Sequence, residues 1–476
     1  MDALIRMTAR EAVRRLRARE VSPLELIDAA ERRIGEVDDA VNALPTRCFE
    51  RARAAAAQLR ASPCADGPGA LHGLPIAIKD LTEVAGVRTT HGSPIFAAHV
   101  PARSDEMVLR LESRGGVVIA KSNTPEFGAG SQTFNEVFGT TANPWDTRKT
   151  CGGSSGGAAV ALATGQIWLA QGSDLGGSLR NPASFCGVVG LRPSPGRVPH
   201  GPRAAPFEGW SVNGPMGRNV GDAALLLDAM AGDMGCDALA LPAPARAFQE
   251  AAERPEDAAW KPRRAAWSPD LGLLPVEPEV RELCARAAEQ LQEDGVAVEE
   301  ACPDLADAEF IFQTHRAHQF ALARGPLMAQ HRDKMKPEVI WNIEQGLKLT
   351  AEDLRRAAAA RGALYHRVVD FFRRYDLLLC PVVGIPAFDK TLRYPTEMAG
   401  VKLDTYVSWM CHCFAITVTS CPALSLPVGL TRAGLPVGLQ IVAPPRGEHA
   451  AIAAATLLER RLDCAAALPI DPRVRT

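Results

Sequence analysis

The sequence predicts an α/β fold in a single large domain. Residues 263–301 alternate between strand, helix and strand patterns, which is typical of sheets whose strands are joined by helical crossovers. Strand-like apolar runs recur from residue 74 to residue 444, so we expect one domain rather than a series of modules. Hydrophobic residues make up 47% of the 476 residues and charged residues 23%, as in ordinary globular proteins.

Three helices are expected at the start of the chain. The sequences TARE at 8–11 and SPLE at 22–25 both fit an N-terminal capping box, the second with proline at the first helical position. We expect helices over about 9–19 and 23–36, and an alanine- and arginine-rich helix over about 47–61. Each has one apolar stripe, which predicts a helical layer that packs on another layer.

A short apolar strand follows and ends at a lysine. Residues 74–79 read LPIAIK, so Lys79 closes a nearly apolar run. We expect a helix over 104–115 and a strand over 117–122. The sequence GGVVIAKS at 115–122 resembles a phosphate-binding loop, but its β-branched residues favour a strand over the glycine-rich turn that a phosphate needs. We therefore predict no phosphate site there.

The C-terminal half combines a helical stretch with further strands. Helical patterns continue through residues 304–375. Other elements are expected in this half, namely strands at 375–386, 417–429 and 434–444 and a helix at 449–462. We predict one domain over 1–476, with a mostly helical subdomain or insertion around 300–400.

Charge and hydropathy argue against two kinds of partner. The net charge of −2 gives no electrostatic basis for binding nucleic acid. No run of 18 apolar residues occurs, so we expect no membrane span. The N-terminal sequence MDALIRMTAREAVRRLRARE is charged from its start and has no apolar h-region, unlike a signal peptide. These features favour a cytoplasmic protein.

The cysteines do not suggest a metal site. Twelve are scattered along the chain without a CxxC pair, which favours reduced thiols. Cys411, His412 and Cys413 are adjacent, but we expect them on a strand, where alternate side chains point to opposite faces. No second group of ligands follows at zinc-site spacing. We predict no metal and no other cofactor.

The most informative stretch runs from residue 151 to 193, where glycine clusters alternate with apolar blocks. It contains Ser154 within GGSSGG and Ser178 within SDLGGSLR. Glycines allow positive φ and a close approach of the backbone to a ligand. A buried serine in such a turn, beside free N–H groups at a helix start, is how a nucleophile meets an oxyanion hole.

These motifs resemble the signature of the amidase signature family of serine hydrolases. GLPIAIKDL at 73–81 comes first, then GGSSGG and SDLGGSLR, with 24 residues from Ser154 to Ser178. The resemblance extends over most of the chain, to GLPVGLQIVAP at 434–444. It implies a mixed, twisted sheet between helical layers, and a stand-alone amidase that acts on a small-molecule amide.

The resemblance also implies roles for single residues. Ser178 is the expected nucleophile, Lys79 the base and Ser154 the relay between them, preceded by a cis peptide bond in the family. Burial favours the neutral amine of a lysine, which the apolar strand before Lys79 would provide. The expected oxyanion donors are the N–H groups of four consecutive residues: Leu175, Gly176, Gly177 and Ser178. In the family, the loop at 123–139 borders the substrate pocket, with Gly128 where the substrate passes.

Neighbouring side chains have structural interpretations. Asp174 and Arg180 flank the nucleophile, and we expect an ion pair that fixes the turn. Ser155 is expected to hold the glycine-rich turn through its hydroxyl. Several aromatic residues are candidates for the pocket, namely Phe127, Phe134, Tyr406 and Trp409.

Other functions remain open. The glutamine-hydrolysing A subunit of a tRNA-dependent amidotransferase resembles the same family and would need partner subunits. An α/β-hydrolase is an alternative because GSSGG fits G-x-S-x-G, yet no histidine stands in a distinctive motif. A binding protein that lost catalysis is a third alternative. The identity of the amide, whether aliphatic, aryl or anilide, and a homodimeric state are left undetermined.

Overall fold

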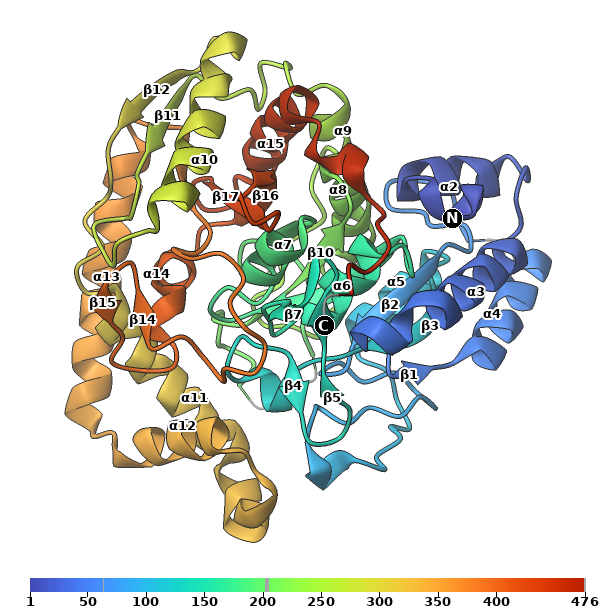
Figure 1. Cartoon of the computed structure of the whole chain (residues 1–476), viewed down its shortest axis with the longest axis horizontal. Coiled ribbons are helices and arrows are strands. Elements are labelled where there is room, and N and C mark those ends of the chain that lie inside the picture. Colours follow the sequence, from blue (N-terminus) through green and yellow to red (C-terminus); the bar gives the residue numbers. More distant parts are fainter. Residues whose placement is uncertain (63, 202–204, 475–476) are drawn as a thin grey trace.

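The computed structural model describes residues 1–62, 64–201 and 205–474, and its centre is an 11-stranded sheet (Figure 1). In spatial order the strands are β1 (Thr46–Arg47), β3 (Val117–Ser122), β2 (Pro75–Lys79), β8 (Leu169–Asp174), β10 (Val212–Gly217), β9 (Val189–Arg192), β16 (Ala423–Leu430), β17 (Pro436–Val442), β13 (Leu377–Pro381), β11 (Arg264–Trp267) and β12 (Ala297–Glu300).

The sheet is mixed. Strand β2 is parallel to β3 and β8, and β11 is parallel to β12 and β13. The remaining neighbours are antiparallel. Three two-stranded sheets lie outside it: β4 (Phe134–Asn135) with β5 (Gly139–Thr140), β6 (Ala142–Asn143) with β7 (Asp146–Thr150), and β14 (Glu397–Met398) with β15 (Val401–Lys402). The predicted α/β fold with a mixed sheet is confirmed.

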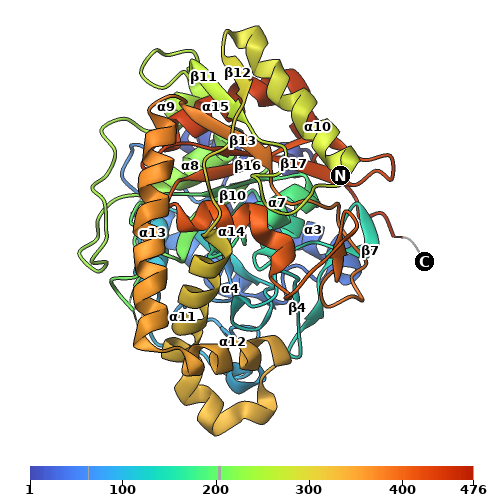
Figure 2. The ribbon, with the colours of Figure 1, turned by 90° about the vertical axis from the view of Figure 1, so that its left-hand side faces the viewer.

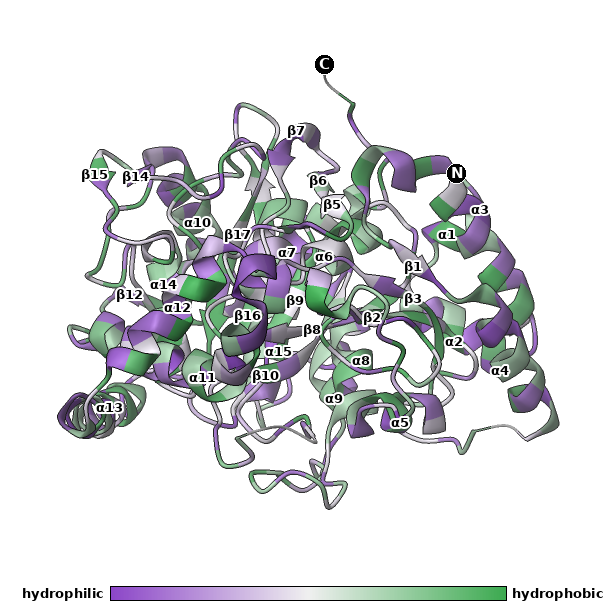
Figure 3. Cartoon of the chain, turned by 90° about the horizontal axis from the view of Figure 1, so that it is seen from below, coloured by the Kyte–Doolittle hydropathy of each residue, from purple (hydrophilic) through white to green (hydrophobic). Residues whose placement is uncertain are grey.

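Helices surround the sheet. At the β1 end lie the N-terminal helices α1 (Ala3–Arg6), α2 (Ala9–Arg17), α3 (Pro23–Val41) and α4 (Phe49–Ala61), and near the other end lies α10 (Pro278–Glu289) (Figure 1). The capping box expected at Ser22 forms, whereas the one expected at Thr8 forms only in part: the Thr8 hydroxyl accepts from Glu11 N, but the Glu11 carboxylate accepts from Arg14 and Arg15. The outer helices α3 and α4 carry both hydrophobic and hydrophilic residues, as helices with one face toward solvent do (Figure 3).

Other helices are packed closely on the strands. Every residue of α6 (Gly156–Ala163), α7 (Arg180–Cys186) and α8 (Val220–Met230) is buried. The rest of this group are α5 (Glu106–Ser113), α9 (Phe248–Glu253) and α15 (Glu448–Leu462). Because α6 and α7 follow the two serine motifs, the sequence around both serines is anchored in the core.

The helical stretch predicted at 304–375 consists of α11 (Ala308–His331), α12 (Pro337–Lys348) and α13 (Ala351–Phe372). Figure 2 shows α13 and α11 side by side, with α12 across their lower end. A small cluster of buried residues joins this region to the loop after β3, and it includes Phe127, Phe320 and Val339. That this region behaves as a subdomain stays a prediction.

The strand expected at Cys411–Cys413 is wrong, and the strand expected at 417–429 begins later than predicted. Residues Cys411, His412 and Cys413 begin a helix, α14 (Cys411–Val418), and β16 starts only at Ala423. Every residue of α14 is buried, so its sequence has no polar face from which a helical period could be read. The strand argument about this cysteine cluster therefore fails. Among the described residues, no group of three or more His, Cys, Asp or Glu side chains is arranged to hold a metal ion.

Two further observations concern the segment before β11 and the character of the helices. The segment between 237 and 262, which is rich in alanine, proline and glutamate, contains α9, whose Phe248 and Ala251 are fully buried in the main core. Across the described part of the chain, none of the helices has the length and apolar character that a membrane span requires.

Candidate active site

Three segments meet at one edge of the sheet to form the candidate site. Strands β2 and β8 are parallel, with Ile76 opposite Leu169, so their carboxyl ends lie at the same edge. Lys79 is the last residue of β2. The turn after β8 carries Ser178, and the loop before α6 carries Ser154. The topology thus brings together three residues that lie up to about a hundred positions apart.

The Lys79 amine is fully buried and surrounded by hydroxyl groups. Its Nζ donates to Ser154 Oγ at 2.7 Å, to Ser155 Oγ at 2.9 Å and to Ser173 Oγ at 3.1 Å. Burial lowers the pKa of Lys79 from 10.5 to about 7, while the charge of Asp174 acts in the opposite direction. A large fraction of this amine is therefore neutral near pH 7 and able to accept a proton.

Ser154 and Ser178 open into the same small cavity. Ser154 follows a cis peptide bond from Gly153. The cavity has a volume of about 100 Å³, and of the expected substrate-binding residues it is lined by Gly128, Ser154, Leu175 and Ser178. Gly128 has a φ of +74°, and a Cβ there would lie 3.3 Å from Ser154 Oγ. A side chain at Gly128 would therefore crowd the Ser154 hydroxyl.

Ser178 is held by its backbone. Its carbonyl accepts a hydrogen bond from Ser155 N at 3.1 Å, which ties the two glycine-rich turns together. Among the described residues, the Ser178 hydroxyl has no hydrogen-bond partner, and 6% of the residue is exposed. This hydroxyl is therefore free to turn toward Ser154 or toward a substrate in the cavity.

The four expected oxyanion donors are not equivalent. The Gly177 N–H already donates to Asp174 Oδ1 at 2.9 Å. In the described part of the chain, the N–H groups of Leu175, Gly176 and Ser178 have no acceptor. Gly177 has a φ of +119°, and a Cβ there would lie 2.5 Å from Cys413 Cβ. Gly177 thus shapes the turn, and the other three N–H groups are not engaged by the described residues.

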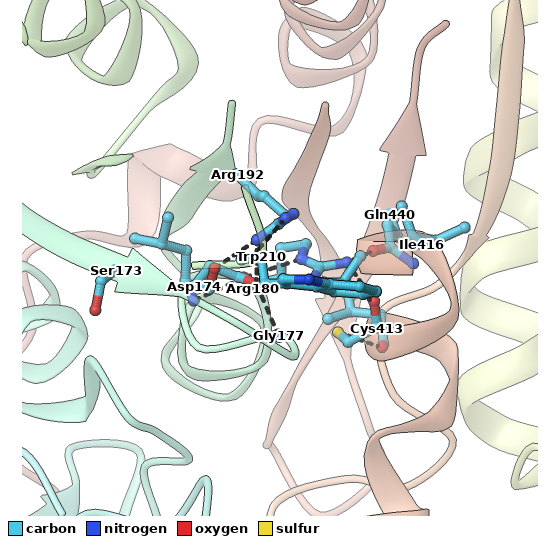
Figure 4. A network of polar contacts seen from close by, with 12 residues as sticks. Ser173, Asp174, Gly177, Arg180, Arg192, Trp210, Cys413, Ile416 and Gln440 are labelled. Atoms are coloured by element: carbon cyan, nitrogen blue, oxygen red, sulfur yellow. Dashed lines mark hydrogen bonds and ion pairs between the residues drawn. The ribbon is translucent and has the colours of Figure 1, made fainter. Parts of the chain in front are cut away.

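A buried charge network fixes this turn, as Figure 4 shows. Arg180 donates to both oxygens of Asp174, at 2.9 and 3.0 Å, and Arg192 Nη1 lies 3.3 Å from the same carboxylate. Arg180 also donates to Gln440 Oε1 at 2.6 Å. Burial alone would raise the pKa of Asp174, but the two guanidinium charges hold it well below its ordinary value. The expected Asp174–Arg180 ion pair is present, and Arg192 is a member that the sequence did not indicate.

Several cavity residues were not expected from the motifs. Leu81 and Ser173 lie within the motifs but had not been assigned to the pocket, and Phe127 was a pocket candidate. The others are Ser211, Arg316 and Phe320, which lie outside the motifs. Among the other aromatic candidates, Trp409 stacks on Phe185 in the core, with ring planes at 8°. Arg316 and Phe320 come from α11, and their local sequence contains no recognisable signal. Only the packing of α11 over the sheet brings them to the serines.

Comparisons with known proteins point in one direction. A family model described as Amidase matches residues 25–452. The acylamidase of Rhodococcus erythropolis is 34% identical over 472 residues, which cover 98% of each chain. The A subunit of the glutamyl-tRNA(Gln) amidotransferase of Moorella thermoacetica is 34% identical over 481 aligned positions, covering 95% of this chain and 96% of that protein.

Solved structures agree with this similarity. A bacterial aryl acylamidase of the amidase signature family superposes with a TM-score of 0.86 at 26% identity, covering 98% of this chain and 99% of that one. A 6-aminohexanoate cyclic dimer hydrolase superposes with a TM-score of 0.88 at 26% identity, covering 99% of both chains.

Proposed function

Because this chain belongs to the amidase family of amide-hydrolysing enzymes, we propose that it cleaves its amide through an acyl-enzyme on Ser178, with Ser154 as relay and Lys79 as base. The observation that carries the proposal is the 2.7 Å hydrogen bond from Lys79 Nζ to Ser154 Oγ, at a cavity that Ser154 shares with Ser178.

Acylation begins with a proton relay. Neutral Lys79 accepts the proton of Ser154, which in turn takes the proton of Ser178. The Ser178 oxygen attacks the amide carbon, and the carbonyl oxygen becomes an oxyanion. The three unengaged N–H groups after Asp174 are the proposed donors to that oxyanion, since fixed dipoles in a site sheltered from water stabilise it strongly.

Collapse of the tetrahedral intermediate releases the amine. The proton held by Lys79 returns through Ser154 to the leaving nitrogen, and the C–N bond breaks to leave an ester on Ser178. A water molecule then loses a proton to the same relay and attacks the ester carbon. The products are a carboxylic acid and ammonia or an amine, and Ser178 regains its proton.

Ser178→Ala tests this proposal directly. Removal of the nucleophile should lower kcat by about a thousandfold or more, since nucleophile loss typically costs several orders of magnitude. The measurement is amine or ammonia release from a panel of aliphatic, aryl and anilide amides. Intact-mass spectrometry with a slowly hydrolysed amide should detect an acyl adduct in the wild type alone.

The control is Ser184→Ala, a buried serine of α7 in the same stretch but outside the cavity. It should retain activity, so a fall in both variants would indicate a general structural effect. If Ser178→Ala kept more than about a tenth of the wild-type rate, another nucleophile would have to be sought.

A second candidate function is the glutamine-hydrolysing component of an amidotransferase. It is favoured by the 34% identity to the Moorella thermoacetica protein, which equals the identity to the acylamidase. The two functions differ in their need for partners. A stand-alone amidase hydrolyses simple amides as a purified single chain, whereas dependence of glutamine hydrolysis on added partner proteins would favour the second candidate.

A further inference from the structure

One wall of the candidate cavity carries a positive charge. Helix α11 contributes Arg316 and Phe320 to the cavity that Ser154 and Ser178 line. Only 5% of Arg316 is exposed, so its guanidinium is nearly removed from bulk water. A charge in that position is unfavourable unless a counter-charge or strong hydrogen bonds compensate for the lost hydration.

The partners of Arg316 satisfy hydrogen bonds but supply no counter-charge. Its Nη1 donates to Asn342 Oδ1 and its Nη2 to the Tyr406 hydroxyl. The guanidinium also lies over the rings of Phe320 and Tyr406, 5.0 and 5.1 Å from their centroids. These are its side-chain contacts among the described residues, and each partner is neutral. A guanidinium has five N–H donors, so three are left for another acceptor.

The neighbouring carboxylates are already engaged elsewhere. Glu338, on the same helix as Asn342, accepts two hydrogen bonds from Arg393, at 2.7 and 2.6 Å. Glu126 accepts from Ser93 Oγ at 2.6 Å and from Lys336 N at 2.8 Å. The Lys336 side chain adds a further cation nearby; its Nζ donates to the Ala129 carbonyl oxygen and, within the described part of the chain, to no carboxylate. By formal charge, Arg316, Lys336 and Arg393 carry three positive charges against two negative charges on Glu126 and Glu338, so this group has an excess of one positive charge, and of these residues Arg316 lines the cavity.

We infer that the cavity selects amides that carry a carboxylate, which pairs with Arg316 while the amide carbon lies beside Ser178. The inference rests on the proposed function and narrows its substrate class. A carboxylate can accept two parallel N–H donors from one guanidinium, which gives direction as well as affinity. The cavity volume of about 100 Å³ lies below the roughly 300–1,000 Å³ of pockets for drug-sized ligands, which favours a short acyl chain.

The test compares charged and neutral amides of equal length. The charged series is malonamate, succinamate and glutaramate, and the neutral series replaces each carboxylate with a methyl ketone. Wild-type kcat/KM should be higher for at least one charged member than for its neutral counterpart. In Arg316→Gln that ratio should fall by about tenfold to a hundredfold, because a charge-assisted hydrogen bond is lost. Arg316→Lys should keep part of the preference.

Arg324→Gln is the matched control. This residue is on the same helix and lies over the Phe127 ring, 4.5 Å from its centroid, but does not line the cavity. Its removal also takes away one positive charge, yet the ratio of charged to neutral kcat/KM should stay within about twofold. If the ratio of charged to neutral kcat/KM fell equally in both arginine variants, the loss of net positive charge would explain the preference. That result would overturn the assignment to Arg316.

A binding measurement separates this inference from the proposed function. Isothermal titration calorimetry measures the binding of the dicarboxylates malonate, succinate and glutarate. They should bind the wild-type protein at least tenfold more tightly than they bind Arg316→Gln. Hydrolysis of neutral amides without any dependence of the charged series on Arg316 would overturn the inference and leave the proposed function standing. Dicarboxylate binding that depends on Arg316, without hydrolysis of any amide, would support the charged cavity and contradict the proposed function.

Discussion

Lys79 combines full burial with three hydroxyl neighbours, and this setting defines its chemistry. An ammonium group in that position can be stabilised by hydroxyl oxygens, but among the described residues it has no carboxylate as a hydrogen-bond partner. Ser155 and Ser173 both accept from it, so Ser155 contacts the lysine directly in addition to holding the turn. The Ser155 and Ser173 hydroxyls also hold the amine where it contacts Ser154.

The pH dependence of activity should report the ionisation of Lys79. Below its pKa of about 7 the amine is protonated and cannot accept a proton, so kcat/KM should fall as pH decreases. Above this pKa the neutral form dominates, so kcat/KM should rise and level off. A profile of kcat/KM from pH 5 to 10 measures this. A plateau reached only near pH 10, as for a lysine in water, would contradict the assigned base.

Substitutions at Lys79 separate a base from a structural cation. Lys79→Ala should lower kcat/KM by about a hundredfold to ten-thousandfold, the usual range for a lost general base. Lys79→Arg should not restore activity, because a guanidinium stays protonated at any working pH. Circular dichroism should verify that both variants are folded. Near-wild-type activity in the arginine variant would rule out proton acceptance by this residue.

At the scale of elements, the turn between β8 and α7 depends on three fully buried charges. Asp174 accepts from Arg180 and Arg192 and also from the N–H groups of Gly177 and Leu179. The carboxylate therefore fixes the backbone that presents Ser178. Cys413 and Thr417 of α14 accept from Arg180 in turn, which links the turn to a helix more than two hundred residues away.

Asp174→Asn should be strongly destabilising. It leaves two buried guanidinium groups without a counter-ion, a change that typically costs about 3–5 kcal/mol of unfolding free energy. Urea denaturation followed by tryptophan fluorescence measures the shift in midpoint. Glu352→Gln is the control, since Glu352 pairs with Arg355 on the solvent side of α13 and such exposed pairs contribute little. An unchanged midpoint in Asp174→Asn would mean that the network does not stabilise the turn.

At the scale of the whole molecule, both halves of the sequence contribute strands to one sheet, with the strands of residues 46–217 at one end and those of residues 264–442 at the other. Strand β9 lies between β10 and β16, with Ser425 opposite Gly190. One cluster of buried hydrophobic residues includes side chains from α11, α13, β13 and α14, so the helical region shares a core with the sheet. Neither half of the chain can complete the sheet alone.

This arrangement predicts a single cooperative unfolding transition for the whole chain. Differential scanning calorimetry should give one peak whose calorimetric and van't Hoff enthalpies agree, the usual sign of two-state unfolding. A separate early transition would instead assign α11–α13 to an independently unfolding subdomain. Limited proteolysis of the intermediate state, with cleavage confined to 308–372, would identify that region.

The sequence by itself determined the α/β class, the family and the positions of most helices and strands, and it predicted the roles of the two serine motifs. The spacing of hydrophobic residues and the capping motif are local properties. The helix at 23–36 and the strand ending at Lys79 could therefore be recognised from a few neighbouring residues. The family resemblance was similarly carried by short motifs, those around Lys79, Ser154 and Ser178.

Only the tertiary structure decided what surrounds those motifs. The helix α14 is buried on all sides, so its residues lack the polar–apolar pattern that distinguishes a helix from a strand. The Gly177 N–H is engaged by Asp174, and Arg316 reaches the cavity from 138 residues beyond Ser178. Such contacts depend on how strands and helices pack across the sheet, and a local sequence pattern carries no information about which distant side chain will fill a given space.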